Sequence, residues 1–350
     1  MTEQSPELAA AAAAYFQDRP PHRLWSGDPA ECLDVELWRS LFSNGFTGVG
    51  IGERLGGSGG TAADAAVLLS LSGRFAAAIP LAEHLWLAGW VLAHADLVVP
   101  DGPITAAAGD LSMERTRTGW EVSGVLSRVA WARSCTDVVV LRPDGAVAVI
   151  PTPACSITHG SNIIGEPRDR VELCRVNLSA DRVGQSTLTP ANLLARGAVG
   201  RLIQVDGAAQ AALERSLRYV GEREQFGRPL ARFQAVQQRL AVVARECALL
   251  DAGVRLCLPA GGVPDRLPDV SVLDIAAAKL NAARAVPVII ANVHQVHGAI
   301  GITSEYGLGE LTLRMSGWVT EFGTDGHWAE ILAHGCTRDD VWDVVIGAAG

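Results

Sequence analysis

Apolar residues recur at helical spacing near both ends of the chain and at strand-like spacing between them. Up to about residue 100 the chain is rich in alanine and leucine and is interrupted by a glycine run at residues 56–60. Thr61 and Asp64 have the spacing of a capping box for the helix that follows this run. From residue 104 to about 183, short β-prone runs alternate with turn signals such as Pro143-Asp-Gly. These patterns predict helices followed by a β unit.

Helical periodicity returns at about residue 190. The periodic stretches cover residues 191–223, 232–258, 270–297 and 304–321. Four helices of this length with short connections predict an antiparallel four-helix bundle. The predicted fold class is α+β, mainly α. It has an N-terminal helical domain (residues 1–102), a middle β domain (residues 103–188) and a C-terminal helical bundle (residues 189–350).

Charge and composition narrow the classes of function. The chain of 350 residues carries 29 basic and 38 acidic side chains, a net charge of -9, which argues against a nucleic-acid groove or a polybasic membrane surface. The most apolar long stretch, around residues 81–100, contains Glu83 and Asp96, which are too costly for a bilayer span. Lys279 is the only lysine. Strong anion contacts must therefore come from arginines or backbone N–H groups.

Cysteine usage and the first residues bear on localisation. The 7 cysteines form no CxxC pair, so neither a disulfide framework nor a zinc cluster is indicated. The N-terminal apolar run lacks a preceding positive region, so a signal peptide is not expected. A reduced, cytoplasmic compartment fits best. His294 and His297 lie three apart without a carboxylate at ligand spacing, and no metal site is predicted.

The first informative segment joins two bundle helices through a tight Gly-x-Pro turn. It reads Arg218-Tyr-Val-Gly-Glu-Arg-Glu-Gln-Phe-Gly-Arg-Pro-Leu230. The guanidinium of Arg223 can grip a diphosphate through two parallel hydrogen bonds. Phe226 can stack on a planar ring. When the segment is taken alone, a solvated helix end with an Arg218–Glu222 ion pair is the favoured explanation.

The second informative segment ends a helix in two glycines spaced three apart. It reads Gln295-Val-His-Gly-Ala-Ile-Gly301. Gln295 offers both a donor and an acceptor for a nucleotide edge. Gly298 and Gly301 allow a ligand to approach bare backbone, whose amides can bind an anion. A glycine-rich helix C-cap is the plainer alternative.

Together, in this order and about seventy residues apart, the two segments resemble the acyl-CoA dehydrogenase family. The resemblance extends to Gly45-Phe46-x-Gly48 through Gly59 near the N-terminus and to Trp120-x-Val-x-Gly124 followed by Trp131-Ala-Arg-Ser. It implies a β-barrel-like middle domain, an FAD cofactor and assembly as a dimer of dimers. Members remove a proton and a hydride across the α,β bond of an acyl-CoA thioester.

The resemblance also implies roles for individual residues. Arg223 and Phe226 would contact the diphosphate and adenosine half of an FAD held mainly by a neighbouring subunit. Gln295, Gly298 and Gly301 would close the same adenosine pocket. At the other end, Trp131 would lie near the isoalloxazine, and Gly323-Thr324 resembles the Gly-Thr pair beside the flavin.

The sequence departs from the family where the reaction takes place. Most members have a glutamate directly before the Gly-Thr pair, but that residue is Phe322 here, and Glu321 lies one residue earlier. One residue is a rotation of about 100° on a helix. Other members keep the base near the place of Gly197, again without a carboxylate here. The loop Ala106–Asp110 is short, and Arg133 stands where a small hydroxyl residue is usual.

The predicted function is FAD-dependent α,β-dehydrogenation of an acyl-CoA thioester to the trans-2-enoyl-CoA. Because the residues that carry out the reaction in the family are partly missing here, we expect the chain to be a subunit of a heteromeric complex. In this it would be similar to actinobacterial members that act on steroid-derived acyl-CoAs. The alternatives are a non-catalytic subunit that only completes a partner's FAD site, a homo-oligomer in which Glu321 is the base, and another reaction of the superfamily, such as oxidase chemistry. Electron-transferring flavoprotein is the acceptor that the resemblance implies.

Overall fold

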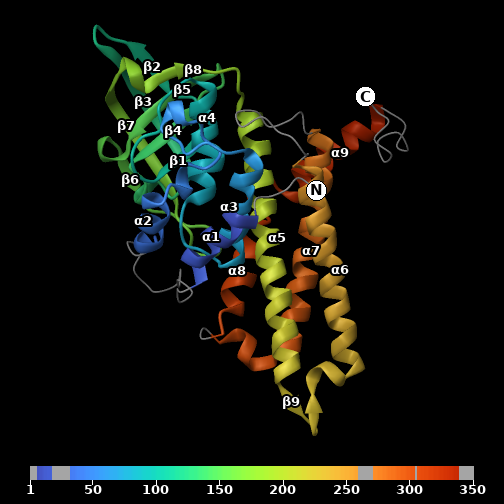
Figure 1. The fold of residues 1–350 in the computed structure, drawn as a ribbon. Coiled ribbons are helices and arrows are strands. Elements are labelled where there is room, and N and C mark those ends of the chain that lie inside the picture. The colour runs from blue at the N-terminus through green and yellow to red at the C-terminus, as the bar shows by residue number, and fades with distance from the viewer. Residues whose placement is uncertain (1–5, 18–31, 259–270, 304–305, 339–350) are drawn as a thin grey trace.

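The computed structural model describes residues 6–17, 32–258, 271–303 and 306–338. Its architecture is α+β and mainly α, with helices on both sides of the β strands in the sequence (Figure 1). The N-terminal elements are α1 (Pro6–Gln17), α2 (Val35–Ser43), α3 (Ala62–Arg74), the π-helix η4 (Ala82–Ala88) and α4 (Gly89–His94). The expected capping box starts α3, where the side chains of Thr61 and Asp64 each accept from the other's backbone N–H.

The middle unit contains two four-stranded sheets. One has the order β1 (Ile104–Ala108), β4 (Asp137–Leu141), β5 (Ala146–Pro151), β8 (Val183–Gln185), and only its β1–β4 pair is parallel. The other has the order β2 (Ser112–Arg115), β3 (Gly119–Ala130), β7 (Arg168–Ser179), β6 (Ser156–Thr158) and is antiparallel. An apolar core contributed by both sheets includes Val122, Val140 and Val171. Among the described residues the strands therefore form two sheets that share one apolar core, and the barrel-like description of the middle domain stays a prediction.

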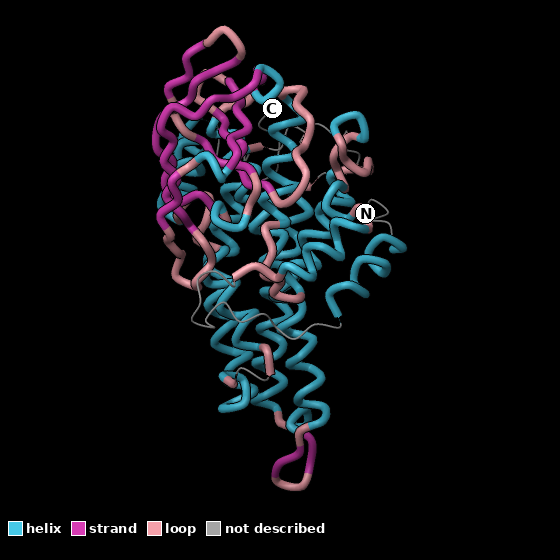
Figure 2. The backbone as a smooth tube through the Cα atoms, turned by 90° about the vertical axis from the view of Figure 1, so that its left-hand side faces the viewer, coloured by secondary structure: helices cyan, strands magenta, loops and turns pink. Residues whose placement is uncertain are grey.

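The C-terminal helices form an elongated bundle (Figures 1 and 2). Its elements are α5 (Pro190–Glu222), α6 (Gln234–Leu256), α7 (Val272–His297), the short η9 (Gly298–Ile302), α8 (Leu308–Trp318) and α9 (Asp325–Arg338). Three of the four predicted helices match closely, but the fourth is shorter than 304–321 because the chain leaves the helix near Val319. Helix α9 was not predicted.

A continuous apolar core joins the N-terminal helices to the bundle. Leu69 on α3, Trp86 on η4, Ile203 on α5 and Val286 on α7 all belong to it. The stretch Val272–Ile302 is long and apolar enough to cross a membrane by length and composition, but it packs against α5 and α6 as a bundle helix. The predicted domain boundaries are not tested by this arrangement.

Candidate functional site

The far end of the bundle carries a projecting two-stranded ribbon. Strands β9 (Glu224–Gln225) and β10 (Arg228–Pro229) pair there, beyond the end of α5 (Figures 1 and 2). The turn between them places both Phe226 and Gly227 at positive φ, +52° and +76°. The left-handed region is natural for glycine but costs a phenylalanine of the order of 1 kcal/mol. Phe226 is nevertheless 90% exposed, and its ring has only an edge-on contact with the ring of Phe233, at 6.1 Å between centroids.

A hollow of about 620 Å³ lies beside the base of this ribbon and brings three predicted residues together. Arg223, at the end of α5, and Gln295 and Gly298, at the end of α7, all line it. Gly298 has φ +63°, and a Cβ added there would meet no atom within 4 Å. Phe226 and Gly301 do not line the hollow. Gly301 lies behind it, where an added Cβ would approach the Cβ of His297 to 2.9 Å.

The polar groups of this hollow are available to a ligand. Within the described part of the chain, neither the guanidinium of Arg223 nor the amide of Gln295 has a hydrogen-bond or ion-pair partner. A nucleotide diphosphate requires a guanidinium that can form paired hydrogen bonds, an amide that both donates and accepts, and a glycine whose backbone N–H is accessible. These residues therefore fit the adenosine diphosphate half of an FAD.

An aromatic group supports the floor of the hollow. The ring of His297 stacks on Tyr219 at 4.6 Å between centroids. Its Nδ1 lies 2.7 Å from the carbonyl oxygen of Val293 and must donate to it, so its Nε2 accepts from the hydroxyl of Tyr306 at 3.2 Å. Burial lowers the pKa of His297, which keeps the ring neutral. The histidine serves as a hydrogen-bonding support, and no group of three or more potential ligands among the described residues can hold a metal.

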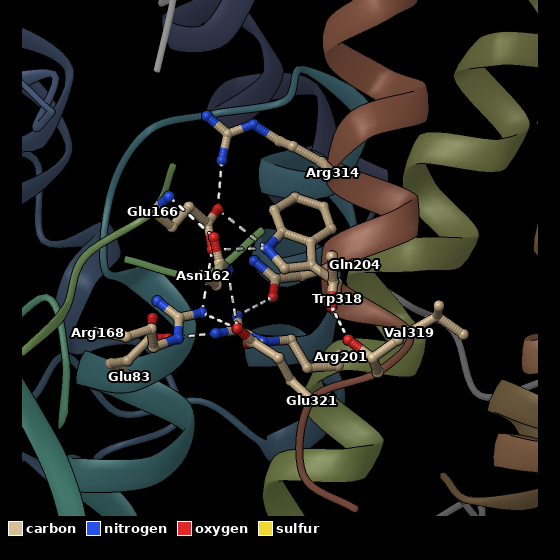
Figure 3. A network of polar contacts seen from close by, with 12 residues as sticks. Glu83, Asn162, Glu166, Arg168, Arg201, Gln204, Arg314, Trp318, Val319 and Glu321 are labelled. Carbon is tan, nitrogen blue, oxygen red and sulfur yellow. Dashed lines mark hydrogen bonds and ion pairs between the residues drawn. The ribbon is translucent and has the colours of Figure 1, made fainter. Parts of the chain in front are cut away.

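A buried ionic network surrounds Glu321, the predicted base (Figure 3). Arg168 from β7 binds one carboxylate oxygen of Glu321, and the amide of Asn162 donates to the same oxygen at 3.0 Å. Arg201 from α5 binds the other oxygen at 2.8 Å. Both oxygens of Glu321 are therefore engaged by donors of the same chain.

The network extends behind Glu321 to two further glutamates. Arg201 also pairs with Glu83 of η4, and Arg168 with Glu166 at 3.1 Å. Arg314 of α8 binds Glu166 at 2.6 Å. The three arginines balance the three glutamates in charge. The sequence predictions missed this network, although isolated ionic residues within apolar runs, such as Glu83 and Arg201, could have indicated buried partners.

The electrostatics of this network make Glu321 a weak base. Burial alone would raise the pKa of Glu321, but the guanidinium groups of Arg168 and Arg201 outweigh burial and lower the pKa to about 2. A general base works best with a pKa near the operating pH. The catalytic role of Glu321 remains a prediction, and the two ion pairs weigh against it.

The two places where family members carry the base contact each other here. Phe322 follows Glu321 at φ +54°, and its ring packs directly on the backbone of Gly197. A Cβ at Gly197 would lie 2.2 Å from that ring. The aromatic ring also lies over Arg201, 5.7 Å from the guanidinium carbon. An apolar side chain thus fills the space in which a carboxylate would have to stand.

The other residues assigned to the flavin end have structural partners. Trp131 is buried in a small apolar cluster with Ala78 and Cys135. Gly323 has φ +102° and has no room for a side chain beside Trp328. The hydroxyl of Thr324 accepts from the backbone N–H of His327 at 3.3 Å and so caps α9. Their predicted proximity to a flavin ring is not tested.

The unexpected arginine after Trp131 is fully used within the chain. The guanidinium of Arg133 pairs with the buried carboxylate of Asp169, and its Nε lies 2.9 Å from one carboxylate oxygen. The same side chain also donates to the carbonyl of Gly160. The charge of Arg133 is thus neutralised by Asp169 on β7.

A second cavity of about 380 Å³ lies between the β unit and the bundle. Its lining includes β1, the end of β3, the start of α5 and the segment that carries Glu321. The sequence predictions did not identify it, because its residues are separated by up to 216 positions, from Ala106 to Phe322. Among them, Arg128 lies on the strand β3 and lines the cavity without being part of the network.

The comparisons with known proteins agree with this architecture. Residues 190–336 match the acyl-CoA dehydrogenase C-terminal domain. Acyl-CoA dehydrogenase IpdE2 of Mycolicibacterium smegmatis is 26% identical over 277 residues, 79% of both chains. Acyl-CoA dehydrogenase FadE28 of Mycobacterium tuberculosis is 27% identical over 326 residues, covering 86% of this chain and 92% of the relative.

Solved structures show that the fold is shared along the whole chain. The ChsE4–ChsE5 complex from Mycobacterium tuberculosis matches with a TM-score of 0.77 at 22% identity, over 97% of this chain and 98% of the matched chain. Butyryl-CoA dehydrogenase from Megasphaera elsdenii matches with a TM-score of 0.76 at 17% identity, over 97% and 99%. The fold is therefore that of the acyl-CoA dehydrogenases.

The matched C-terminal domain and the relatives give the class of protein that this chain resembles. Residues 190–336 match the C-terminal domain of the acyl-CoA dehydrogenases, and over most of its length the chain is similar to oxidoreductases named acyl-CoA dehydrogenases. Proteins of that family use FAD, and the similar structures include a steroid acyl-CoA dehydrogenase and a butyryl-CoA dehydrogenase.

Proposed function

We propose that this chain is a subunit of a heteromeric, FAD-dependent acyl-CoA dehydrogenase that converts an acyl-CoA thioester to the trans-2-enoyl-CoA. In this complex the hollow at the bundle end completes an FAD site that another subunit mainly builds, and that subunit supplies the base. The observation that carries the proposal is an asymmetry. Arg223 and Gln295 have no partners in the described chain, whereas both carboxylate oxygens of Glu321 are occupied.

The ribbon supports a subunit boundary at this end of the bundle. Phe226 is held in a strained conformation with its ring in solvent, which is costly unless another molecule covers it. A neighbouring subunit would cover the rest of the FAD, as expected for a dimer of dimers.

Related proteins support the heteromeric form and the substrate class. The ChsE4–ChsE5 structure and the Tcur3481–Tcur3483 steroid acyl-CoA dehydrogenase are both described as pairs of chains. An electron-transferring flavoprotein structure from Acidaminococcus fermentans also matches this fold. These relatives support a steroid-derived or other lipid acyl-CoA as the substrate and an electron-transferring flavoprotein as the acceptor.

Co-expression tests this proposal. The lone chain should bind little flavin and show no turnover, whereas co-expression with a neighbouring dehydrogenase gene should yield a flavin-containing complex. Arg223→Ala should then lower the FAD content of the complex. Arg232→Ala is the matched control, because Arg232 lies on the same end of the bundle but does not line the hollow.

The second candidate function is a catalytic homo-oligomer with Glu321 as its base. It is favoured by one observation, that Glu321 lines the cavity of about 380 Å³. Stoichiometric flavin in the lone chain, together with turnover that Glu321→Gln lowers by about 10²–10⁴-fold, would establish it and refute the heteromeric proposal.

A further inference from the structure

We propose that the buried guanidinium of Arg196 binds one small monovalent anion of the halide class inside the chain. The site lies where α5 packs against η4, beside α4. Arg196 lines neither the cavity of about 380 Å³ nor the hollow of about 620 Å³. The site is therefore separate from both, and its occupation requires no flavin, acyl-CoA or turnover.

Arg196 is fixed in place by Trp86 of η4. Its Nε donates to the carbonyl oxygen of Trp86, and the indole Nε1 of Trp86 donates to the carbonyl oxygen of Arg196 at 2.8 Å. The guanidinium carbon lies 4.3 Å from the centroid of the Trp86 ring and 4.6 Å from that of the Trp90 ring. Only 4% of Arg196 is exposed. The cation is therefore held against two aromatic rings and away from bulk water.

Two hydrogen-bond donors at this place have no acceptor. Within the part of the chain that the structure describes, Nη1 of Arg196 and Nε1 of Trp90 are both buried and make no hydrogen bond. The two side chains are neighbours, because the guanidinium lies against the Trp90 ring. Buried donors in folded proteins nearly always have a partner, which is a bound water or ion where the chain supplies none. An acceptor from outside the chain is therefore expected here.

The charge of Arg196 favours an ion over a water as this acceptor. Among the described residues four arginines are buried, and three of them pair with glutamates: Arg168, Arg201 and Arg314. Arg196 forms no such pair. Burial lowers the pKa of Arg196 to about 9, which leaves the guanidinium protonated at neutral pH. A water would accept from Nη1 but leave the charge unbalanced, whereas an anion accepts the hydrogen bond and balances the charge.

The surroundings select a small and weakly hydrated anion. Trp86 and Trp90 are 0% and 6% exposed, so the body of an organic anion has no open path to the guanidinium. Taking an ion out of water is costly, and the cost is largest for ions of high charge density such as fluoride and sulfate. We therefore expect chloride and bromide to bind, and fluoride and sulfate to bind poorly.

Thermal unfolding of the full chain tests the proposal. Sodium bromide replaces sodium fluoride at constant ionic strength and pH, and the Tm is followed through the titration. At a bromide concentration ten times the dissociation constant, the anion should raise the folding equilibrium constant of the wild type about elevenfold. For a chain of this length that is a Tm shift of about 2 °C.

Two variants separate the site from general salt effects. Arg196→Met should lack the bromide shift and show only the effect of the salt on unfolding. Arg228→Met is the matched control, because Arg228 also lies over an aromatic ring, 4.2 Å from the centroid of Phe233, but is exposed. It should respond to bromide as the wild type does.

A crystal soaked in sodium bromide gives a second measurement that needs no variant, so it decides the question even if Arg196→Met folds poorly. The anomalous signal of bromide should lie within hydrogen-bond distance of Nη1 of Arg196. The proposal would be overturned by a wild type and an Arg196→Met variant that respond equally to bromide, or by an anomalous map without bromide at Nη1. Either result would show that the two tryptophan rings alone stabilise the cation. It would leave the proposed function untouched.

Discussion

Replacing Glu321 by glutamine removes one negative charge from a buried network that is neutral only while Glu321 is ionised. The guanidinium groups of Arg168 and Arg201 lower the pKa of this carboxyl from its ordinary 4.5 to about 2 in the folded chain. At 1.36 kcal/mol for each pKa unit, the ionised form stabilises the fold by about 3 kcal/mol at neutral pH. Removing one partner of a buried ion pair costs about 3–5 kcal/mol, which agrees with the stabilisation worked out from the pKa. We therefore expect Glu321→Gln to act mainly on stability.

The expected change can be measured by thermal unfolding. With an unfolding entropy of about 2.1 cal/mol/K per residue, a loss of about 3 kcal/mol lowers the Tm of a chain of this length by about 4 °C. Glu172→Gln is the matched control. It removes one partner of the Arg170–Glu172 pair, whose side chains are 51% and 45% exposed, and should cost less than about 1 kcal/mol.

The pH dependence gives a second readout of the same residue. Because the folded-state pKa of Glu321 is lowered, its contribution is complete above pH 4.5 and is lost as the pH falls from 4.5 toward 2. The difference in Tm between wild type and Glu321→Gln should shrink in that window. A variant that unfolds with the wild type at pH 7, yet loses turnover, would refute the network argument and make Glu321 the base.

Three further predictions concern other residues. Phe226→Gly relieves the left-handed strain and should stabilise the lone chain by about 1 kcal/mol, measured by urea unfolding, while lowering FAD retention in the co-expressed complex; unchanged stability would contradict the strain. Burial lowers the pKa of His84 to about 4 from 6.5, so stability should fall by up to about 3 kcal/mol as the pH drops from 6.5 to 4. His84→Gln should flatten that dependence in urea unfolding, and an unaltered pH profile would exclude His84 as its source. Gly197→Ala should cost about 1–3 kcal/mol in the same assay, because the new methyl group meets Phe322, and Phe322→Ala should recover part of it; additive losses would exclude the clash.

The parts predicted well from the sequence depend on local signals. The capping box at Thr61 and the glycines after Gln295 set element ends within a few residues, so the order of helices and strands followed from them. The gathering of Arg223, Gln295 and Gly298 around one hollow was implied by the family resemblance and not by local signals.

The parts that were missed depend on distant contacts. Arg201 pairs with Glu83 across 118 positions, Arg168 with Glu321 across 153 and Arg314 with Glu166 across 148. No periodicity in the sequence connects such residues, and the sequence alone does not distinguish a buried ionic residue from an exposed one. The register shift between Leu126 and Val129 of β3 is likewise set by the pairing of β3 with β7 and not by local sequence.

The ionic network also affects how the molecule comes apart. Glu83 belongs to the N-terminal helices, Arg168 to the β unit, and Arg201 and Arg314 to the bundle, so these residues join all three regions at one point. If any one region unfolded alone, the charged partners in the other regions would be left unpaired in a low-dielectric interior, at a cost of several kcal/mol. The chain should therefore unfold in one cooperative transition, although its sequence divides into a helical, a β and a second helical segment.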